Sequence, residues 1–189
     1  MNTDVLIIGA GPAGLFAALT LIEHGIKPII FERGKPVAQR VEDVQRFWKT
    51  GAFNPASNVQ FGEGGAGTFS DGKLNTGVNN PRIGWILSQF VRFGARDNIL
   101  YDAKPHVGTD VLLTVVQNLR KRICDLGGDV RFNSQVTGIL TDGEKLTGLT
   151  LESGETVFFA VGLAHLLGDG GIIERLQDAG YTVELVEFQ

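Results

Sequence analysis

A glycine-rich turn near the start of the chain has the residue types and the spacing that bind a phosphorylated ligand. Residues 9–14 read GAGPAG and follow an apolar run over residues 5–8. In this pattern the first glycine permits a tight turn, the second lets the backbone approach a pyrophosphate, and the third lets a helix pack closely on a strand. The N–H groups that begin this helix then face the phosphates. We therefore expect contacts with a bound dinucleotide at Gly9, Gly11, Pro12, Ala13 and Gly14.

An acidic residue ends the second apolar run, residues 29–31. Glu32 lies 18 residues after Gly14, where its carboxylate can accept hydrogen bonds from ribose hydroxyls. Between the two runs, leucines and an isoleucine recur at helical spacing, and Gly25 provides a helix stop. Together these features predict a βαβ unit that binds an adenine dinucleotide.

A second glycine-rich stretch, residues 61–74, reads FGEGGAGTFSDGKL. It repeats the spacing of the first turn, but residues 54–58 before it are typical of a loop, and no strand ending in an acid follows it. We interpret this second glycine loop as backbone that passes close to a flat or phosphorylated ligand. A mobile surface loop is the alternative.

Periodicity predicts the remaining elements. Apolar residues recur at helical spacing in three further segments, residues 37–49, 81–93 and 110–126. Thr109 or Asp110 is expected to cap the last helix. The period then changes to two, which predicts the strands of a β-meander, over residues 130–132, 135–140, 145–151 and 156–161. No third strand directly follows Glu32, and this disfavours an NAD-dependent dehydrogenase.

Composition narrows the class of protein. The 189 residues are 43% hydrophobic and 20% charged, with a net charge of −4, which is typical of a globular domain and argues against a nucleic-acid partner. No apolar run of membrane-spanning length and no signal peptide is evident, so we expect a cytoplasmic protein without a membrane partner. The single cysteine, Cys124, excludes an internal disulfide and a redox-active pair. No cluster of residues has metal-ligand spacing, so no metal is expected.

The first glycine turn, the Glu32-Arg33-Gly34 sequence and the second glycine loop together resemble a known family. They are similar to the FAD-dependent oxidoreductases of the glutathione-reductase-like superfamily, and among these to uncharacterised FAD-dependent dehydrogenases. The resemblance implies an α/β chain with a three-layer Rossmann-like FAD-binding fold, a parallel sheet and a β-meander. It also implies extended FAD, with the pyrophosphate at residues 9–14, the ribose on Glu32, and the second glycine loop near the pyrophosphate and the isoalloxazine.

The resemblance implies further cofactor contacts. Arg33 and Arg40 match positions that flank the adenosine or the phosphates, and Val136 matches a position whose backbone contacts adenine. Residues 157–162 are similar to a strand that returns under the cofactor and ends in an Ala-x-Gly element. Beyond the first turn, the implied cofactor residues are Glu32, Arg33, Arg40, Gly64, Gly65, Ala66, Gly67, Thr68, Val136, Ala160 and Gly162.

Three residues of the second glycine loop are candidate catalytic side chains. Lys73 could place positive charge near a reduced flavin, and Ser70 or Asp71 could hydrogen-bond its edge. The alternative is that all three are solvated turn residues.

The sequence predicts an FAD-binding domain over residues 1–162, with its β-meander over residues 129–161, and a C-terminal tail of unclear role over residues 163–189. The family continues into a substrate domain, so the chain is expected to be truncated. We expect an FAD-dependent oxidoreductase that transfers a hydride between an unknown substrate and the flavin. Its partner is a small-molecule substrate or an external electron partner. The alternative is a truncated, non-catalytic dinucleotide-binding module.

Overall fold

The structure of the protein is a computed structural model that describes residues 5–74, 79–143, 145–154, 156–158, 177–178 and 180. Its elements in chain order are β1 (Leu6–Ile8), α1 (Pro12–Glu23), β2 (Ile29–Phe31), α2 (Val37–Thr50), the 3-10 helix η1 (Ala66–Phe69), α3 (Arg82–Arg92), the 3-10 helix η2 (Asp97–Leu100), α4 (Thr109–Asp125), β3 (Asp129–Arg131), β4 (Val136–Asp142), β5 (Lys145–Leu151) and β6 (Thr156–Phe158). The helices expected from periodicity are therefore confirmed.

The first sheet is parallel, with strand order β1-β2-β3. Leu6 pairs with Ile29, and Ile30 pairs with Val130. Helix α1 connects β1 to β2, and α4 returns the chain to the free side of β2. The expected α/β class with a parallel sheet is confirmed.

The third parallel strand corrects one sequence-based prediction. Residues 130–132 were expected in the β-meander, but β3 instead pairs with β2, where Glu32 N–H donates to the Arg131 carbonyl at 2.8 Å. A strand of three residues carries too little periodicity to reveal its partner, which is set by the place to which α4 returns the chain. As expected, no third strand directly follows Glu32: α2, η1, α3, η2 and α4 come between β2 and β3, and the third parallel strand is formed late in the chain.

The second sheet is an antiparallel meander of strand order β4-β5-β6. Strands β4 and β5 pair closely, with Thr141 opposite Leu146, and Gly143 turns between them at a φ of 60°. Among the described residues the meander therefore begins at Val136 rather than at residue 129, and its last strand is described as far as Phe158. Residues 159–162 and nearly all of the predicted tail, residues 163–189, lie outside the described residues.

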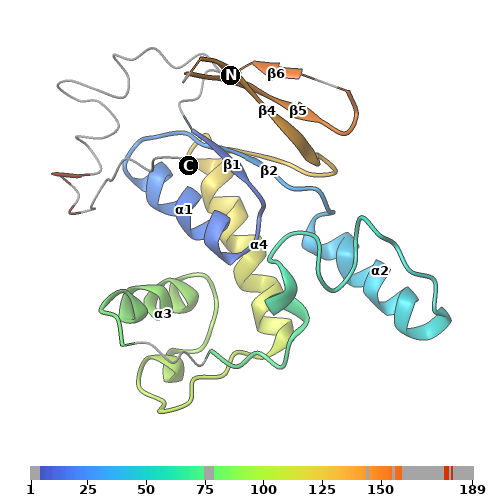
Figure 1. The fold of residues 1–189 in the computed structure, drawn as a ribbon. Coiled ribbons are helices and arrows are strands. Elements are labelled where there is room, and N and C mark those ends of the chain that lie inside the picture. Colours follow the sequence, from blue (N-terminus) through green and yellow to red (C-terminus); the bar gives the residue numbers. More distant parts are fainter. Residues whose placement is uncertain are drawn as a thin grey trace.

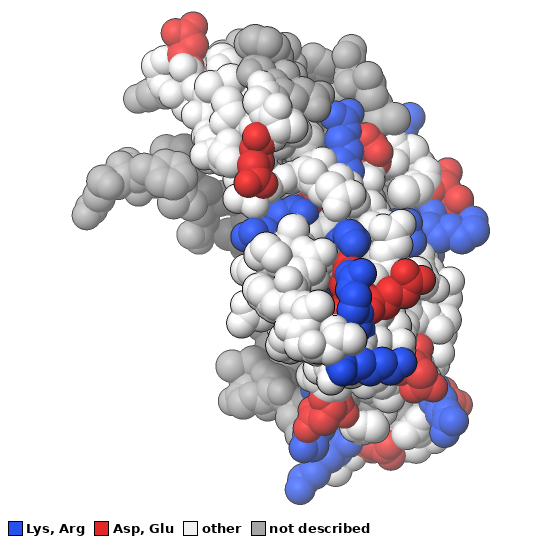
Figure 2. Space-filling model, turned by 90° about the vertical axis from the view of Figure 1, so that its right-hand side faces the viewer, with Lys and Arg blue, Asp and Glu red and all other residues white. Residues whose placement is uncertain are grey.

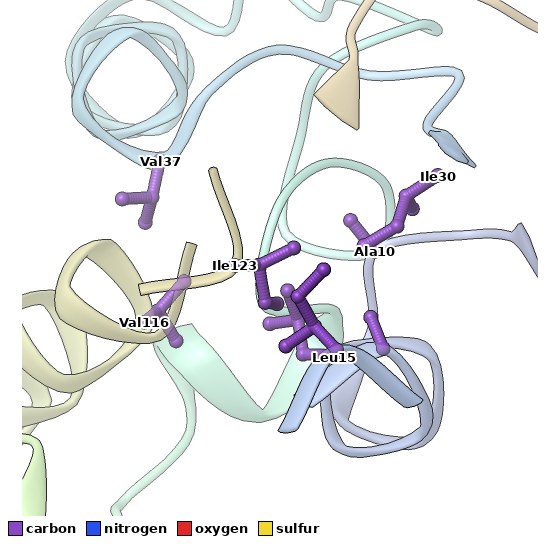
Figure 3. Packing of buried hydrophobic residues seen from close by; sticks show 8 residues of the cluster. Ala10, Leu15, Ile30, Val37, Val116 and Ile123 are labelled. Carbon is purple, nitrogen blue, oxygen red and sulfur yellow. The ribbon is translucent and has the colours of Figure 1, made fainter. Parts of the chain in front are cut away.

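Strand β2 divides the core into two faces, because successive side chains of a strand point to opposite sides. Ile29 and Phe31 pack against Leu149 and Leu151 of the meander. Ile30 points the other way, into a cluster with α1 and α4 (Figure 3). The meander thus covers one face of the parallel sheet, and α1 and α4 cover the other (Figure 1).

Helix α4 begins without the side-chain cap that the sequence predicted. The residue before α4 is Gly108, which has no side chain to cap the helix. Thr109 instead donates its hydroxyl to the Ser70 carbonyl at 3.1 Å. The expected side-chain cap is therefore wrong, because this hydroxyl binds the second glycine loop.

On the face shown in Figure 2, Lys and Arg side chains are interspersed with Asp and Glu side chains.

Replacing Ile30 by Ala tests the two-faced core. Ile30 is fully buried, and removing its side chain leaves a cavity that is expected to cost about 2–5 kcal/mol of unfolding free energy. The measurement is denaturant unfolding followed by circular dichroism. Ile139→Ala, at a residue of β4 that is 61% exposed, is the matched control and should cost less than about 1 kcal/mol. Equal losses for the two variants would contradict this packing.

Candidate cofactor site

The first glycine turn has the geometry that its spacing predicts. Gly9 has a φ of 99°, which favours glycine, and its N–H donates to the Phe31 carbonyl at 2.7 Å. A Cβ on Gly14 would lie 2.0 Å from the Gly9 carbonyl oxygen, so only glycine permits this packing of helix and turn. A Cβ on Gly11 would meet no atom within 4 Å. The start of α1 therefore opens onto free space, where its N–H groups can face an anion.

Glu32 joins the end of β2 to this turn. Its side chain is 5% exposed, Oε2 accepts the Ala10 N–H at 2.8 Å, and Oε1 accepts the Gly34 N–H at 2.8 Å. A carboxylate has about four acceptor sites, so each oxygen keeps one for another donor. Glu32 can therefore shape the turn and still accept a hydrogen bond from a ribose hydroxyl.

A cavity of about 340 Å³ lies where the first turn, β2, the second glycine loop and the start of β4 meet. Six residues predicted to bind the cofactor line it: Gly9, Gly11, Glu32, Arg33, Gly65 and Val136. The four segments are far apart in sequence, and the structure brings them to one place. We call this the nucleotide cavity.

Phe61 is a wall residue of the nucleotide cavity that the motif alone does not single out. The guanidinium carbon of Arg33 lies 4.1 Å from the centre of its ring, which is a cation–π contact. This contact ties the second glycine loop to the end of β2. The only signal in the sequence is the position of Phe61 next to the loop glycines, because its role depends on stacking across the fold.

The second glycine loop lies directly against the first turn. The Gly64 N–H donates to the Ala10 carbonyl at 2.8 Å. A Cβ on Gly65 would lie 3.2 Å from Pro12 Cδ, and Gly65 has a φ of 66° and a ψ of −168°, a conformation that is essentially restricted to glycine. The loop glycines thus permit a close approach between two backbone segments.

Arg40 holds this loop from behind and does not line the nucleotide cavity. Its side chain is fully buried, and its guanidinium donates five hydrogen bonds of 2.7 to 3.4 Å, all to backbone carbonyls of the loop and of the two residues 58 and 59 shortly before it. The acceptors belong to Asn58, Val59, Gly62, Glu63 and Gly65. Burial lowers the pKa of Arg40 to about 10, although the charges of Glu32 and Glu63 oppose this change. The structure corrects the expected contact with the cofactor, because α2 points this side chain into the protein.

A second, apolar cavity of about 110 Å³ lies on the other side of the loop, between α1, α3 and α4. Four predicted cofactor residues line it: Pro12, Gly64, Gly67 and Thr68. Thr68 is 2% exposed, and its Oγ1 has no hydrogen-bond partner among the described residues. Ala13 and Ala66 are exposed and line neither of these two cavities. Ala160 and Gly162 lie outside the described residues.

The candidate catalytic residues lie near the apolar cavity. Ser70 and Lys73 are among its lining residues, and the Ser70 hydroxyl donates to the Gly67 carbonyl at 2.7 Å. Lys73 Nζ lies 2.6 Å from Asp71 Oδ2, and both side chains are largely exposed. The hydrogen bond between them lowers the pKa of Asp71 and raises the pKa of Lys73. The structure does not bring these three side chains into the nucleotide cavity.

The described part of the chain has neither a metal-binding cluster nor a membrane-spanning helix. No three His, Cys, Asp or Glu side chains in it are placed to hold a metal ion. None of its helices combines the length and the apolar character needed to cross a bilayer.

Two family models match parts of the chain. Residues 2–42, which contain the first turn and Glu32, match the FAD binding domain. The cofactor of this site is FAD. The residues fit this group, because Gly11 opens onto free space and Glu32 keeps acceptor sites beside it. Residues 144–185 match the TraB/PrgY/gumN family, and most of them lie outside the described residues.

Relatives match the chain over different lengths. An uncharacterized protein of Clostridium beijerinckii is 50% identical over 146 residues, which are 77% of this chain and 27% of that protein. The chain therefore spans about a quarter of the length of this relative. Thiamine thiazole synthase of Sulfolobus acidocaldarius is 54% identical over 33 residues, 18% of this chain and 12% of that protein.

Two solved structures share the fold. The 3-ketosteroid-Δ4-(5α)-dehydrogenase of Rhodococcus jostii RHA1 matches 85% of this chain and 44% of its own, with a TM-score of 0.51 and 13% identity. OTEMO, in complex with FAD and NADP, matches 83% of this chain and 24% of its own, with a TM-score of 0.50 and 18% identity. At this level of identity the likeness concerns the fold alone.

Glu32→Gln tests the carboxylate of the FAD site. The new amide would place an N–H₂ donor against the N–H of Ala10 or Gly34, and the first turn would lose one charged acceptor. We expect the dissociation constant for FAD to rise by about tenfold or more, which corresponds to about 1.4 kcal/mol. Titration of the apoprotein with FAD, followed by flavin fluorescence, measures it. Glu42→Gln, at an exposed position of α2, should leave the affinity unchanged; a comparable loss there would count against the role of Glu32.

Arg40→Met tests the support of the second glycine loop. The variant removes five hydrogen bonds and leaves the loop carbonyls and two nearby acids without their buried cation. We expect unfolding free energy to fall by about 3–5 kcal/mol, as measured by denaturant unfolding. Lys49→Met, on the exposed end of the same helix, should cost under about 0.5 kcal/mol. Similar stabilities for the two variants would show that Arg40 does not hold the loop.

Proposed function

We propose that this chain is the FAD-binding part of an FAD-dependent oxidoreductase with a Rossmann-like fold. The observation that carries this proposal is the meeting of the first turn, Glu32 and the second glycine loop at one cavity. FAD supplies the redox chemistry when bound, by accepting or donating a hydride. The chain's own residues orient the cofactor and shape the space around it. The overall reaction is a hydride transfer between a small-molecule substrate and the flavin.

The lining of the two cavities supports one orientation of FAD. The nucleotide cavity offers the carboxylate of Glu32 and the backbone near Val136, which suit the ribose and the adenine. The start of α1 suits the pyrophosphate. The apolar cavity has mostly aliphatic and aromatic walls together with the Thr68 hydroxyl, which has no hydrogen-bond partner among the described residues. This lining suits the flavin end of the cofactor.

The electron partner in this proposal is external to the chain. These 189 residues carry one dinucleotide-binding unit, so the proposal assigns reduction of the flavin to a donor that lies outside them. This partner is a small molecule or a redox protein.

One observation favours the alternative of a non-catalytic FAD-binding module. The candidate catalytic pair, Asp71 and Lys73, form an exposed ion pair with each other. In this alternative the loop only supports the cofactor, and the bound flavin does not turn over with any donor.

A visible absorption spectrum and an anaerobic reduction test both functions. We expect the purified protein to show the absorption of oxidised flavin, and heat denaturation to release FAD. In the oxidoreductase, NADH, NADPH or an organic donor from a panel should bleach the bound flavin faster than free FAD. Gly14→Ala, which forces a Cβ onto the Gly9 carbonyl, should be colourless.

The other outcomes separate the hypotheses. Protein that is colourless and takes up no added FAD would contradict FAD binding by this chain. Bound FAD that no donor in the panel reduces faster than free FAD would favour the non-catalytic module.

A further inference from the structure

Glu63 is a fully buried acid near the start of the second glycine loop. It lines neither the nucleotide cavity nor the apolar cavity. Its Oε2 accepts the N–H of Val37, the first residue of α2, at 2.7 Å. Its Oε1 lies 2.8 Å from Arg120 Nε of α4 in an ion pair. The carboxylate therefore connects the loop to two helices.

The main chain of Glu63 is held as firmly as its side chain. Its N–H donates to the Lys35 carbonyl at 3.1 Å, and its carbonyl accepts from Arg40 Nη1 at 2.8 Å. The glycines on both sides, Gly62 and Gly64, have φ values of 121° and 84°, a region that glycine enters with little steric cost. Glu63 is thus a firmly anchored residue between two neighbours whose backbone conformations favour glycine.

The position of Glu63 determines where the neighbouring loop residues lie at the wall of the FAD site. Gly62 and Gly65 line the nucleotide cavity, and the Gly64 N–H binds the Ala10 carbonyl of the first turn. A shift of Glu63 would move the glycines on both sides, because they follow it directly along the chain. The contacts of Glu63 therefore reach the cofactor site through the backbone.

The charges around Glu63 make this anchor dependent on its protonation. Arg120 of α4 and Arg40 of α2 face it with positive charge, and Glu32 at the end of β2 adds negative charge. Burial raises the pKa of Glu63, Glu32 adds to this rise, and the Val37 N–H and Arg120 oppose it. Protonation would remove the charge that Arg120 faces and would weaken the anchor.

We infer that Glu63 is a positioning residue for FAD. In its ionised form it holds the second glycine loop in the shape that binds the cofactor, without contacting the cofactor itself. This inference rests on the FAD site described above. It assigns to Glu63, a buried residue that contacts α2 and α4, an effect on the affinity of the chain for FAD.

The first test is a double-mutant cycle on the affinity for FAD. Glu63→Gln keeps the shape of the side chain but removes its charge, and it should raise the dissociation constant at least tenfold at neutral pH. Arg120→Gln should also weaken binding. The double variant should bind no more weakly than Glu63→Gln alone, because it leaves no unpaired charge. Glu63→Gln affinity within twofold of the parent, or changes that multiply in the double variant, would overturn the inference.

The pH profile gives a readout that a purely structural role would not move. In the parent chain, FAD affinity should fall as the pH is lowered through the raised pKa of Glu63, because the proton removes the anchoring charge. This dependence should disappear in Glu63→Gln and persist in the Glu42→Gln control. Glu63→Asp keeps the charge on a shorter stem, so it should bind more weakly than the parent and retain the dependence. An unchanged profile in Glu63→Gln would overturn the inference.

Circular dichroism and unfolding midpoints of each apoprotein separate misfolding from loss of positioning. If Glu63→Gln does not fold, Glu63→Asp and Arg120→Gln carry the test through their affinities and pH profiles. Failure of the parent chain to bind FAD would refute the FAD site itself. Normal binding by the parent together with normal binding by all the Glu63 variants would refute only the positioning role.

Discussion

The backbone of Ala10 is the junction on which the cofactor site depends. Its N–H donates to Glu32 and its carbonyl accepts from Gly64, so one peptide segment joins the end of β2, the first turn and the second glycine loop. Ala10 is fully buried, and a buried backbone group that lost its partner would cost about 1–3 kcal/mol. The N–H and the carbonyl of Ala10 therefore keep the two loops aligned, because these buried groups cannot form hydrogen bonds with water.

Buried charge supports this junction from behind. Arg40 and Glu63 are fully buried, and burying an ion is costly unless other groups satisfy it. Both meet this requirement with backbone groups: Arg40 donates to carbonyls of the loop and of residues 58 and 59 before it, and Glu63 accepts the first N–H of α2. The cost of burying them is thus offset by hydrogen bonds that specify one loop shape, where glycine alone would permit many. A rigid loop at the mouth of a nucleotide cavity loses little further entropy when the cofactor binds.

The sequence predicted the elements whose structure depends on interactions between residues close together in the chain. The turn of residues 9–14 and the carboxylate of Glu32 could be placed because each glycine has a steric task that depends only on its neighbours. Helix α4 could be placed because its apolar residues recur every turn. The partner of β3, the true role of Arg40 and the contact between Phe61 and Arg33 could not be predicted. Each depends on where a distant segment of the chain returns.

The sequence by itself determined a strand, a phosphate-binding turn, a helix and an acid, and therefore the class of ligand. These features depend on residues that lie close together in the chain. Only the tertiary structure decided which side chains line the two cavities. It buries Arg40, which was expected beside the adenosine or the phosphates, places Thr68 beside an apolar cavity, and makes Glu63 a link between the loop and two helices. The physical reason is that burial and hydrogen-bond partners are properties of the packed chain, and residue type alone does not specify them.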